Sequence, residues 1–406
     1  MSNQENNQKQ IQFPAQQELK HLRTRCGKVY ALGNNRFRAV VQTTPVHEYD
    51  AATHQWVELS AEKRQQMAAQ AHSPIATFAD NSADSAAGIL DTYVKEGSQQ
   101  NFSHDERLWI SNTNYYGNRL TYLKVVDLPR LGANHFITSA KLCVRNVYAP
   151  TADTAIMCKE VLEDWDPETI TYDHQPDVSS VYQDYCRVVK NQYSWKEFDV
   201  TSLARKWYLG ENHGVQLSAP ESESSFSQLH SSETANQPYF VLEYASLTGL
   251  ESYLTYDHQS AGLAGTGSVS LVNGNLIFAH ADTAMNGNRL PVSVTHYYNS
   301  CDSDKDEFGM GYGWRTSLHQ TLHKVLYNGE VEFVYTDGDG TEHFFKKNKD
   351  DQKKYSDQSG LSLTLEIGDE NITITDKGDN VMTFPMVSDT PTEDAPETAK
   401  VLIQKI

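Results

Sequence analysis

Residues 120–148, LTYLKVVDLPRLGANHFITSAKLCVRNVY, contain two strand-like runs on either side of a turn-rich middle. Thr, Tyr and Val favour strands, whereas Pro, Gly and Asn favour turns. Further runs of this kind lie on both sides, at the spacing that is typical of a β-sandwich: residues 89–96, 106–112, 155–162, 196–200, 214–219 and 239–245. The sequence therefore predicts an all-β fold with a sandwich over residues 88–246.

One helix is predicted inside this block, in the stretch DVTSLARKWYLG at residues 199–210. Thr201 can cap its first turn, and Leu203 and Trp207 fall on the same helical face. Gly210 is the expected end of the helix.

The residues before the sandwich divide into three predicted parts. Residues 1–17 are rich in Gln and Asn and are predicted to be disordered. Residues 18–59 have apolar residues on both sides of two turn signals, which predicts a leader of two β-hairpins. Residues 60–87 are rich in Ala, Gln and Ser and are predicted to be a linker.

A connector at residues 247–267 leads to a second β-rich region at residues 268–386. Within it, YTDGDGTEHFF at residues 335–345 is similar to ITDKGDNVMTF at residues 374–384, which predicts one hairpin used twice. Residues 387–406 form an acidic tail and the expected start of a truncated continuation.

Composition excludes several partners. The formal net charge of -19 disfavours nucleic acid and anionic lipid, because both are bound by concentrated basic surfaces. No apolar run reaches the roughly 20 residues that span a bilayer, so membrane insertion is not expected. No signal peptide is visible at the N-terminus. The five cysteines are scattered, which favours buried free thiols, with a Cys143–Cys158 bridge left open.

Two resemblances bear on function. The sandwich block resembles the DNRLRE family of carbohydrate-binding-module-like jelly rolls, in residues 91–94, 120–131, 137–144, 163–176 and 198–217. Residues 265–300, 308–314 and 335–345 resemble the domain that precedes the repeats of RHS (YD-repeat) proteins, and the leader resembles theirs. These resemblances imply a jelly roll followed by an RHS-type β domain, in a secreted or cell-surface polypeptide with an RHS shell downstream.

Catalytic motifs are represented only by fragments. The sequence has no G-x-S-x-G, H-E-x-x-H or Walker motif. Abundant acidic residues leave a polysaccharide hydrolase open, but sequence separation cannot show that two carboxylates face each other. We therefore expect a protein that is not an enzyme.

Calcium is the cofactor that the jelly-roll resemblance implies, because such domains often hold one structural calcium ion. Asp91 and Asn101 are the predicted ligands, placed to join the first strand to a loop. Turn hydrogen bonding by Asp91 is the favoured alternative. Asp337 and Asp339 are interpreted as hairpin turn residues.

Glycan binding needs flat aromatic faces beside planar hydrogen-bonding groups. Two groups of residues meet this description: Tyr115, Tyr116, Asn118 and Arg119 in one turn, and Tyr172 and His174 in the loop after Trp165. At most one of the two adjacent tyrosines is expected on any platform if the chain is extended. Trp109 and Trp207 are predicted to be core residues and Trp165 a packing residue.

The sequence thus predicts a non-catalytic N-terminal region of an RHS protein. Its jelly roll is expected to attach to a polysaccharide or cell-surface glycan. The alternatives are a structural plug or adaptor of the RHS shell that binds no glycan and, less favoured, a polysaccharide hydrolase.

Overall fold

The computed structural model confirms the predicted all-β fold. It describes residues 19, 23–33, 36–42, 47–50, 55–58, 60, 88–131, 135–147, 153–222, 224–251, 254–285, 292–302, 309–327, 330–348, 351–358, 361–392 and 397–405. The predicted tail, residues 1–17, and residues 61–87 of the predicted linker lie outside the described residues. Among the described helices, none has the length and apolar character needed to cross a membrane.

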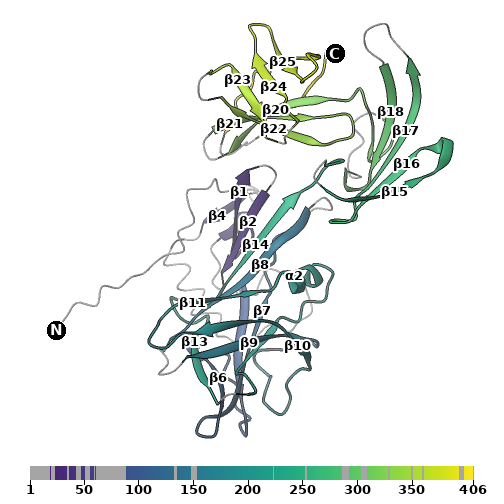
Figure 1. The fold of residues 1–406 in the computed structure, drawn as a ribbon. Helices are drawn as coiled ribbons and strands as arrows, with labels where there is room; N and C mark the ends of the chain where they lie inside the picture. The colour runs from purple at the N-terminus through teal and green to yellow at the C-terminus, as the bar shows by residue number, and fades with distance from the viewer. Residues whose placement is uncertain are drawn as a thin grey trace.

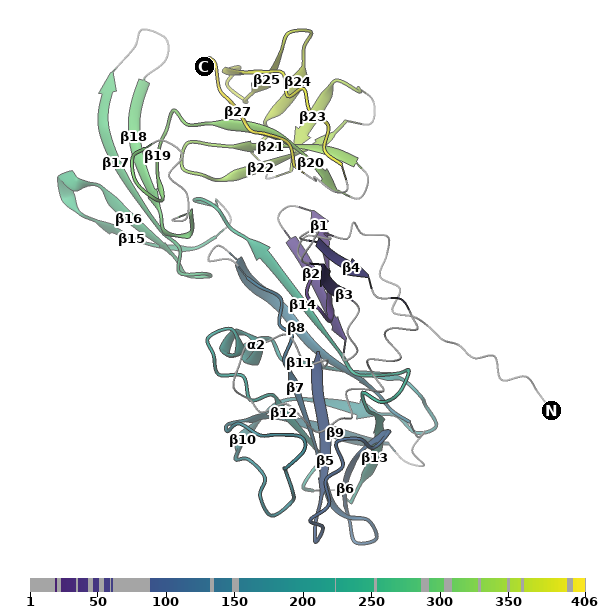
Figure 2. The same ribbon diagram turned by 180° about the vertical axis from the view of Figure 1, so that it is seen from behind.

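The sandwich consists of two antiparallel sheets (Figures 1 and 2). The first sheet has the strand order β1 (Gly27–Gly33), β2 (Arg36–Gln42), β14 (Tyr239–Ser246), β8 (His135–Arg145) and β11 (Trp195–Asp199). The second has the order β10 (Val178–Val188), β9 (Thr154–Val161), β12 (Val215–Ser218), β7 (Gly117–Val125), β6 (Arg107–Thr113) and β13 (Phe226–His230), and β5 (Ile89–Lys95) pairs with β7.

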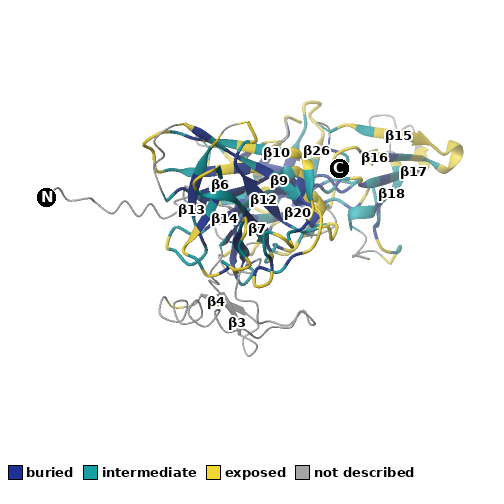
Figure 3. Ribbon diagram, turned by 90° about the horizontal axis from the view of Figure 1, so that it is seen from below, coloured by how far each residue is buried: buried dark blue, intermediate teal, exposed yellow. Residues whose placement is uncertain are grey.

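One hydrophobic core lies between these sheets. Phe198 and Phe240 from the first sheet meet Leu123 and Val215 from the second, and all four are fully buried. Burying a side chain of this size contributes about 1.5–3 kcal/mol. Figure 3 shows the buried residues, in dark blue, along the strands of the sandwich.

The first leader hairpin forms part of the sandwich. β2 pairs with β14 over its whole length, from Tyr239 opposite Gln42 to Ala245 opposite Arg36. Val29 of β1 and Val41 of β2 are buried in the sandwich core. The second predicted hairpin is present as β3 (His47–Asp50) and β4 (Gln55–Glu58), which pair only with each other among the described strands.

The predicted helix is α2 (Thr201–Trp207). Leu203 and Trp207 are buried in the sandwich core, as predicted. Gly210, with φ of +98°, follows the helix in the left-handed conformation that favours glycine. The predicted cap is wrong: Thr201 lies inside the helix, and its hydroxyl accepts a hydrogen bond from the N–H of Ala140 at 2.9 Å.

The second region begins with a five-stranded antiparallel sheet. Its order is β15 (Tyr256–Ser260), β16 (Thr266–Ser270), β17 (Leu276–Met285), β18 (Val292–Asn299) and β19 (Trp314–Thr316). Figure 3 shows exposed residues, in yellow, along the edge strand β15.

A nearly closed, barrel-like sheet follows. Its order is β26 (Val381–Pro385), β25 (Asn371–Thr375), β24 (Thr364–Ile367), β23 (Lys354–Asp357), β22 (Glu342–Lys347), β21 (Glu330–Thr336), β20 (Thr321–Tyr327) and β27 (Val401–Leu402). Leu402 pairs with β20, while Lys405 bridges to Thr383 of β26. Residues 401–405 of the predicted tail therefore connect the first and last strands of this sheet.

The repeated hairpin is confirmed. Asp337 in the first copy and Asp376 in the second each accept two backbone N–H groups of their turn. The strand pairs that frame the turns also match, because Thr336 lies opposite Glu342 and Thr375 opposite Val381.

All five cysteines are free thiols. Cys143 and Cys158 are both buried and are not bridged. Burial raises the pKa of the Cys143 thiol to about 12, so it stays protonated.

Candidate functional site

An aromatic cluster lies on the outer side of β6 and β13. Leu108 and Ile110 are buried in the sandwich core, so Trp109 between them faces the other way. The Trp109 ring centroid lies 5.8 Å from those of Tyr116 and Phe226, which stack on each other at 4.8 Å. Trp109 is half-buried, and its predicted core position is therefore wrong.

Arg119 of β7 covers this cluster. Its guanidinium carbon lies 4.2 Å from the centroid of the Trp109 ring and 5.8 Å from that of Tyr116. Stacking of this kind is an attractive cation–π interaction. A guanidinium held against a ring still offers N–H donors along its edge, and these suit vicinal oxygen atoms.

The β6–β7 turn brings the first predicted group together. Tyr115 is 86% exposed, and its ring meets that of Tyr116 edge-on at 4.7 Å. The two rings touch because these residues form a turn and not an extended strand. Asn118 follows on β7, and its N–H donates to the Glu96 carboxylate at 3.2 Å.

The second predicted group lies in the 162–177 loop. Trp165 is buried and donates its ring N–H to the carbonyl of His213 at 2.8 Å, so its predicted packing role is confirmed. Tyr172 packs against the small hydrophobic cluster that contains Trp165. His174 is exposed, and its Nδ1 lies 3.3 Å from the hydroxyl of Thr171.

The loop between β5 and β6 contacts both predicted groups. Glu96 accepts the bond from Asn118 described above, and the Gln99 amide donates to Asp173. The two groups therefore border the same loop, although no ring contact joins them among the described residues.

Trp109 and Phe226 are the members of the cluster that sequence reasoning missed. A signal for Trp109 was present in residues 106–112, ERLWISN, because Leu108 and Ile110 alternate with it. Phe226 has no such signal, since it reaches Trp109 only through the pairing of β13 with β6.

The two predicted calcium ligands have separate partners. Ser232 donates its N–H and its hydroxyl to the buried Asp91 carboxylate, each at 2.8 Å. Asn101 instead accepts from the N–H and the hydroxyl of Ser103 with its Oδ1. Within the described residues, no group of three or more His, Cys, Asp or Glu side chains is arranged to hold a metal ion.

The pKa of the Asp91 carboxyl group is shifted by its surroundings. Burial first, and then the charge of Glu233, raise its pKa to about 8 against the opposing effect of the Ser232 bonds. A cation between the two carboxylates would relieve this repulsion. Calcium takes six to eight oxygen ligands, and the described residues do not bring such a set together at Asp91 or at Asn101, so calcium stays a prediction.

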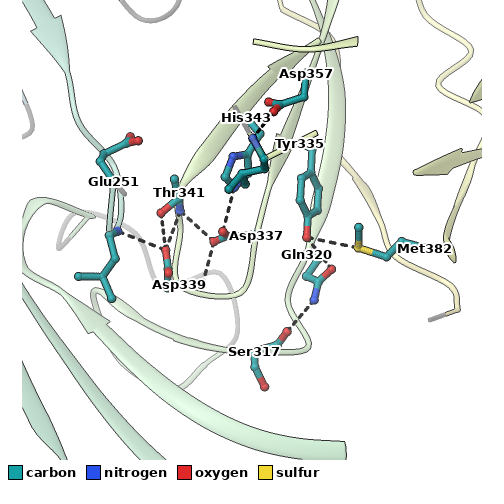
Figure 4. A network of polar contacts seen from close by, with 12 residues as sticks. Glu251, Ser317, Gln320, Tyr335, Asp337, Asp339, Thr341, His343, Asp357 and Met382 are labelled. Carbon is teal, nitrogen blue, oxygen red and sulfur yellow. Dashed lines mark hydrogen bonds and ion pairs between the residues drawn. The ribbon is translucent and has the colours of Figure 1, made fainter. Parts of the chain in front are cut away.

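A second cluster of titratable groups lies at the β21–β22 hairpin (Figure 4). His343 Nε2 lies 2.9 Å from Asp337 Oδ2. The Asp339 carboxylate accepts from the N–H and the hydroxyl of Thr341, at 3.0 and 2.6 Å, and from the N–H of Leu250 at 3.4 Å. The hairpin turn therefore binds the connector that leads out of the sandwich.

The two carboxyl groups of this turn differ in pKa. Burial acts to raise the pKa of Asp337, but the hydrogen bond and charge of His343 outweigh it and lower the pKa. Burial and the neighbouring charge of Asp337 raise the pKa of Asp339 to about 6. Two neighbouring carboxyl groups whose pKa values differ can serve acid–base catalysis. Here both act as hydrogen-bond acceptors that hold the turn, as predicted for hairpin turn residues.

Comparisons with known families give two matches. Residues 82–244 match the model of carbohydrate-binding module family 96, a span that runs from before β5 into β14. Residues 266–345 match a domain of unknown function, DUF6531, from β16 into β22. A search of the curated proteins finds no match.

Proposed function

We propose that the sandwich binds a polysaccharide or cell-surface glycan through the cluster of Trp109, Tyr116, Phe226 and Arg119. The observation that carries this proposal is a half-exposed aromatic cluster with a stacked guanidinium, within the span that matches a carbohydrate-binding module family. Aromatic faces cover the apolar face of a sugar ring, and the guanidinium donates to its hydroxyl groups.

The exposed turn extends this surface. Tyr115 supplies an exposed ring at its edge, and Asn118 supplies an amide that can both donate and accept. Tyr172 and His174, across the β5–β6 loop, are the residues that a longer glycan would reach. The role is binding, and no catalytic step is assigned to the chain.

We further propose that the chain is the N-terminal region of a secreted or surface RHS protein. The repeated hairpin and the nearly closed sheet of the second region support an RHS-type shell, to which the sandwich would be attached. A plug or adaptor of that shell, without glycan affinity, is the alternative that the experiment below tests.

The test is a glycan array probed with the whole chain, followed by titration of any glycan that binds. Arg119→Ala should weaken binding about tenfold, because it removes charge-assisted hydrogen bonds and the stacked cation. Tyr116→Ala should also weaken it. The matched control is Tyr185→Ala, which removes an exposed tyrosine on β10. An array without signal from the folded chain would contradict glycan binding and favour the plug.

A further inference from the structure

The five-stranded sheet of β15 to β19 has one face that points away from the barrel-like sheet and the connector. On the other face, Arg315 of β19 donates to the carbonyl of Asp337 at 3.0 Å, and Asn299 of β18 donates to the connector. Trp314 and Tyr298 precede these two residues on their strands and therefore point to the opposite side, the outer face. Figures 1 and 2 show this sheet at the margin of the molecule, next to the barrel-like sheet.

Three aromatic side chains form a row on the outer face. Phe278 of β17 lies opposite Tyr298 of β18, which in turn lies opposite Trp314 of β19. The ring centroids of Tyr298 and Trp314 are 5.4 Å apart, and all three residues are partly exposed. Neighbouring strands are about 4.8 Å apart, so the row spans roughly 10 Å across the sheet.

The aromatic row is not buried against a second layer. Among the described residues, the hydrophobic core clusters contain none from β15 to β19. Gly267 lies opposite Phe278, and a Cβ there would come within 3.8 Å of the Phe278 ring. Glycine inside a strand often marks a place that a ligand approaches closely, and exposed apolar patches mark interaction sites.

A polar row lies beside the aromatic row. His280 of β17 is opposite His296 of β18, and the Asp282 carboxylate contacts both imidazoles, at 3.6 Å from Nε2 of His280. Asp282 is the extra residue of a β-bulge, a feature that redirects side chains beside functional sites. The three side chains are between 31% and 39% exposed, so a ligand can reach them. A carboxylate has about four acceptor positions, which leaves Asp282 able to accept from hydroxyl groups.

The charge of the outer face favours a neutral ligand. Arg315 is the one Lys or Arg among the described residues 254–285, 292–302 and 309–316, and it lies on the opposite face. Asp257 and Asp282 lie on the outer face and would repel an anionic chain. A neutral sugar chain instead brings apolar ring faces for the aromatic row and hydroxyl groups for the polar row.

We propose that the outer face binds a neutral, extended polysaccharide of β-1,4-linked hexoses. The flat chain lies across β17, β18 and β19, with its sugar faces on the aromatic row and its hydroxyl groups donating to Asp282. Successive units of such a chain are spaced much as neighbouring strands are, so the row accommodates about two units. This site lies in the second region and does not depend on the aromatic cluster of the sandwich.

The test is calorimetric titration of the whole chain carrying Tyr116→Ala, so that the aromatic cluster of the sandwich does not contribute. Cellohexaose should bind at least about tenfold more tightly than maltohexaose, because the α-1,4 linkages of maltohexaose curve the chain away from a flat row of rings. Tyr298→Ala and Trp314→Ala should each weaken cellohexaose binding about tenfold, and Asp282→Ala should weaken it several-fold.

The matched control is Tyr193→Ala, which removes an exposed tyrosine of the sandwich and should bind as the parent chain does. The proposal is overturned if the parent does not bind cellohexaose, or binds maltohexaose equally well. It is also overturned if Tyr298→Ala and Trp314→Ala keep both the thermal transition and the affinity of the parent. If these two variants lose that transition, Asp282→Ala and His296→Ala decide, and parental affinity in both overturns the proposal.

Discussion

Asp91 holds its proton at neutral pH, because burial and Glu233 raise its pKa to about 8. In the unfolded chain the same group ionises near its model value of 3.8. Between these values the folded state binds one more proton than the unfolded state. Rising pH therefore removes stability across this window, by at most about 1.4 kcal/mol per pH unit.

Asp91→Asn should make the free energy of unfolding depend less on pH. We expect its free energy of unfolding to fall less steeply than that of the wild type between pH 5 and 8, measured by urea denaturation in a chelator. Asp369→Asn, which changes an exposed carboxylate of the barrel-like sheet, is the control. Calcium should also flatten the wild-type curve if it binds the ionised carboxylate. Parallel curves for wild type and Asp91→Asn would contradict the raised pKa.

Individual residues were predictable where the local pattern determines their environment. Leu203, Trp207 and Trp165 lie where the sequence places them. Trp109 lies on the face opposite to Leu108 and Ile110, so its position between two core residues does not make it a core residue. Phe226 was beyond prediction, because it reaches Trp109 only through the pairing of β13 with β6.

At the scale of elements, the connector at residues 247–267 forms a close contact with the β21–β22 hairpin. Gly249 lies against this hairpin, and a Cβ there would come within 2.3 Å of the Thr341 backbone nitrogen and 2.5 Å of Asp339 Oδ1. The hydrogen bond from Leu250 to Asp339 adjoins this contact. The two elements can therefore approach this closely only with glycine at position 249.

Gly249→Ala should move the connector off the hairpin and destabilise the chain by about 1–3 kcal/mol, the usual cost of overpacking. Chemical denaturation measures this loss. Gly267→Ala is the matched control, because its Cβ would meet nothing closer than 3.6 Å. Equal stability of the two variants would show that the connector does not rest on the hairpin.

Elements were predictable where their signals are local. The repeated Thr-Asp turn identified both hairpins, and the alternation in residues 18–59 identified two more. Local signals do not show which strands pair with each other when the strands come from distant parts of the chain. β2 pairs with β14 although the paired residues are about 200 positions apart, as Val41 opposite Phe240 shows. No turn joins these two strands directly, so no local turn signal predicts their pairing.

At the scale of the whole molecule, the leader is part of the sandwich core. β1 and β2 cover the edge of β14 and bury Val29, Ala39 and Val41. Without them, β14 would present an unpaired edge beside exposed apolar side chains, which promotes aggregation.

Removal of residues 1–42 should therefore prevent the sandwich from folding stably. We expect insoluble protein, or a loss of the cooperative thermal transition followed by circular dichroism. Removal of residues 1–17, the predicted disordered tail, should leave the transition temperature within a few degrees of the original. A cooperative, soluble sandwich without residues 1–42 would contradict the structural role of the hairpin.

The segment at residues 401–405, which contains β27, determines the order of events during synthesis. A ribosome releases the chain from its N-terminus, so β14 emerges about 150 residues before the strand that joins β20 to β26. The sandwich can complete its sheets while the barrel-like sheet is still open on the ribosome. Its unpaired strand edges then stay accessible to chaperones until residues 401–405 emerge.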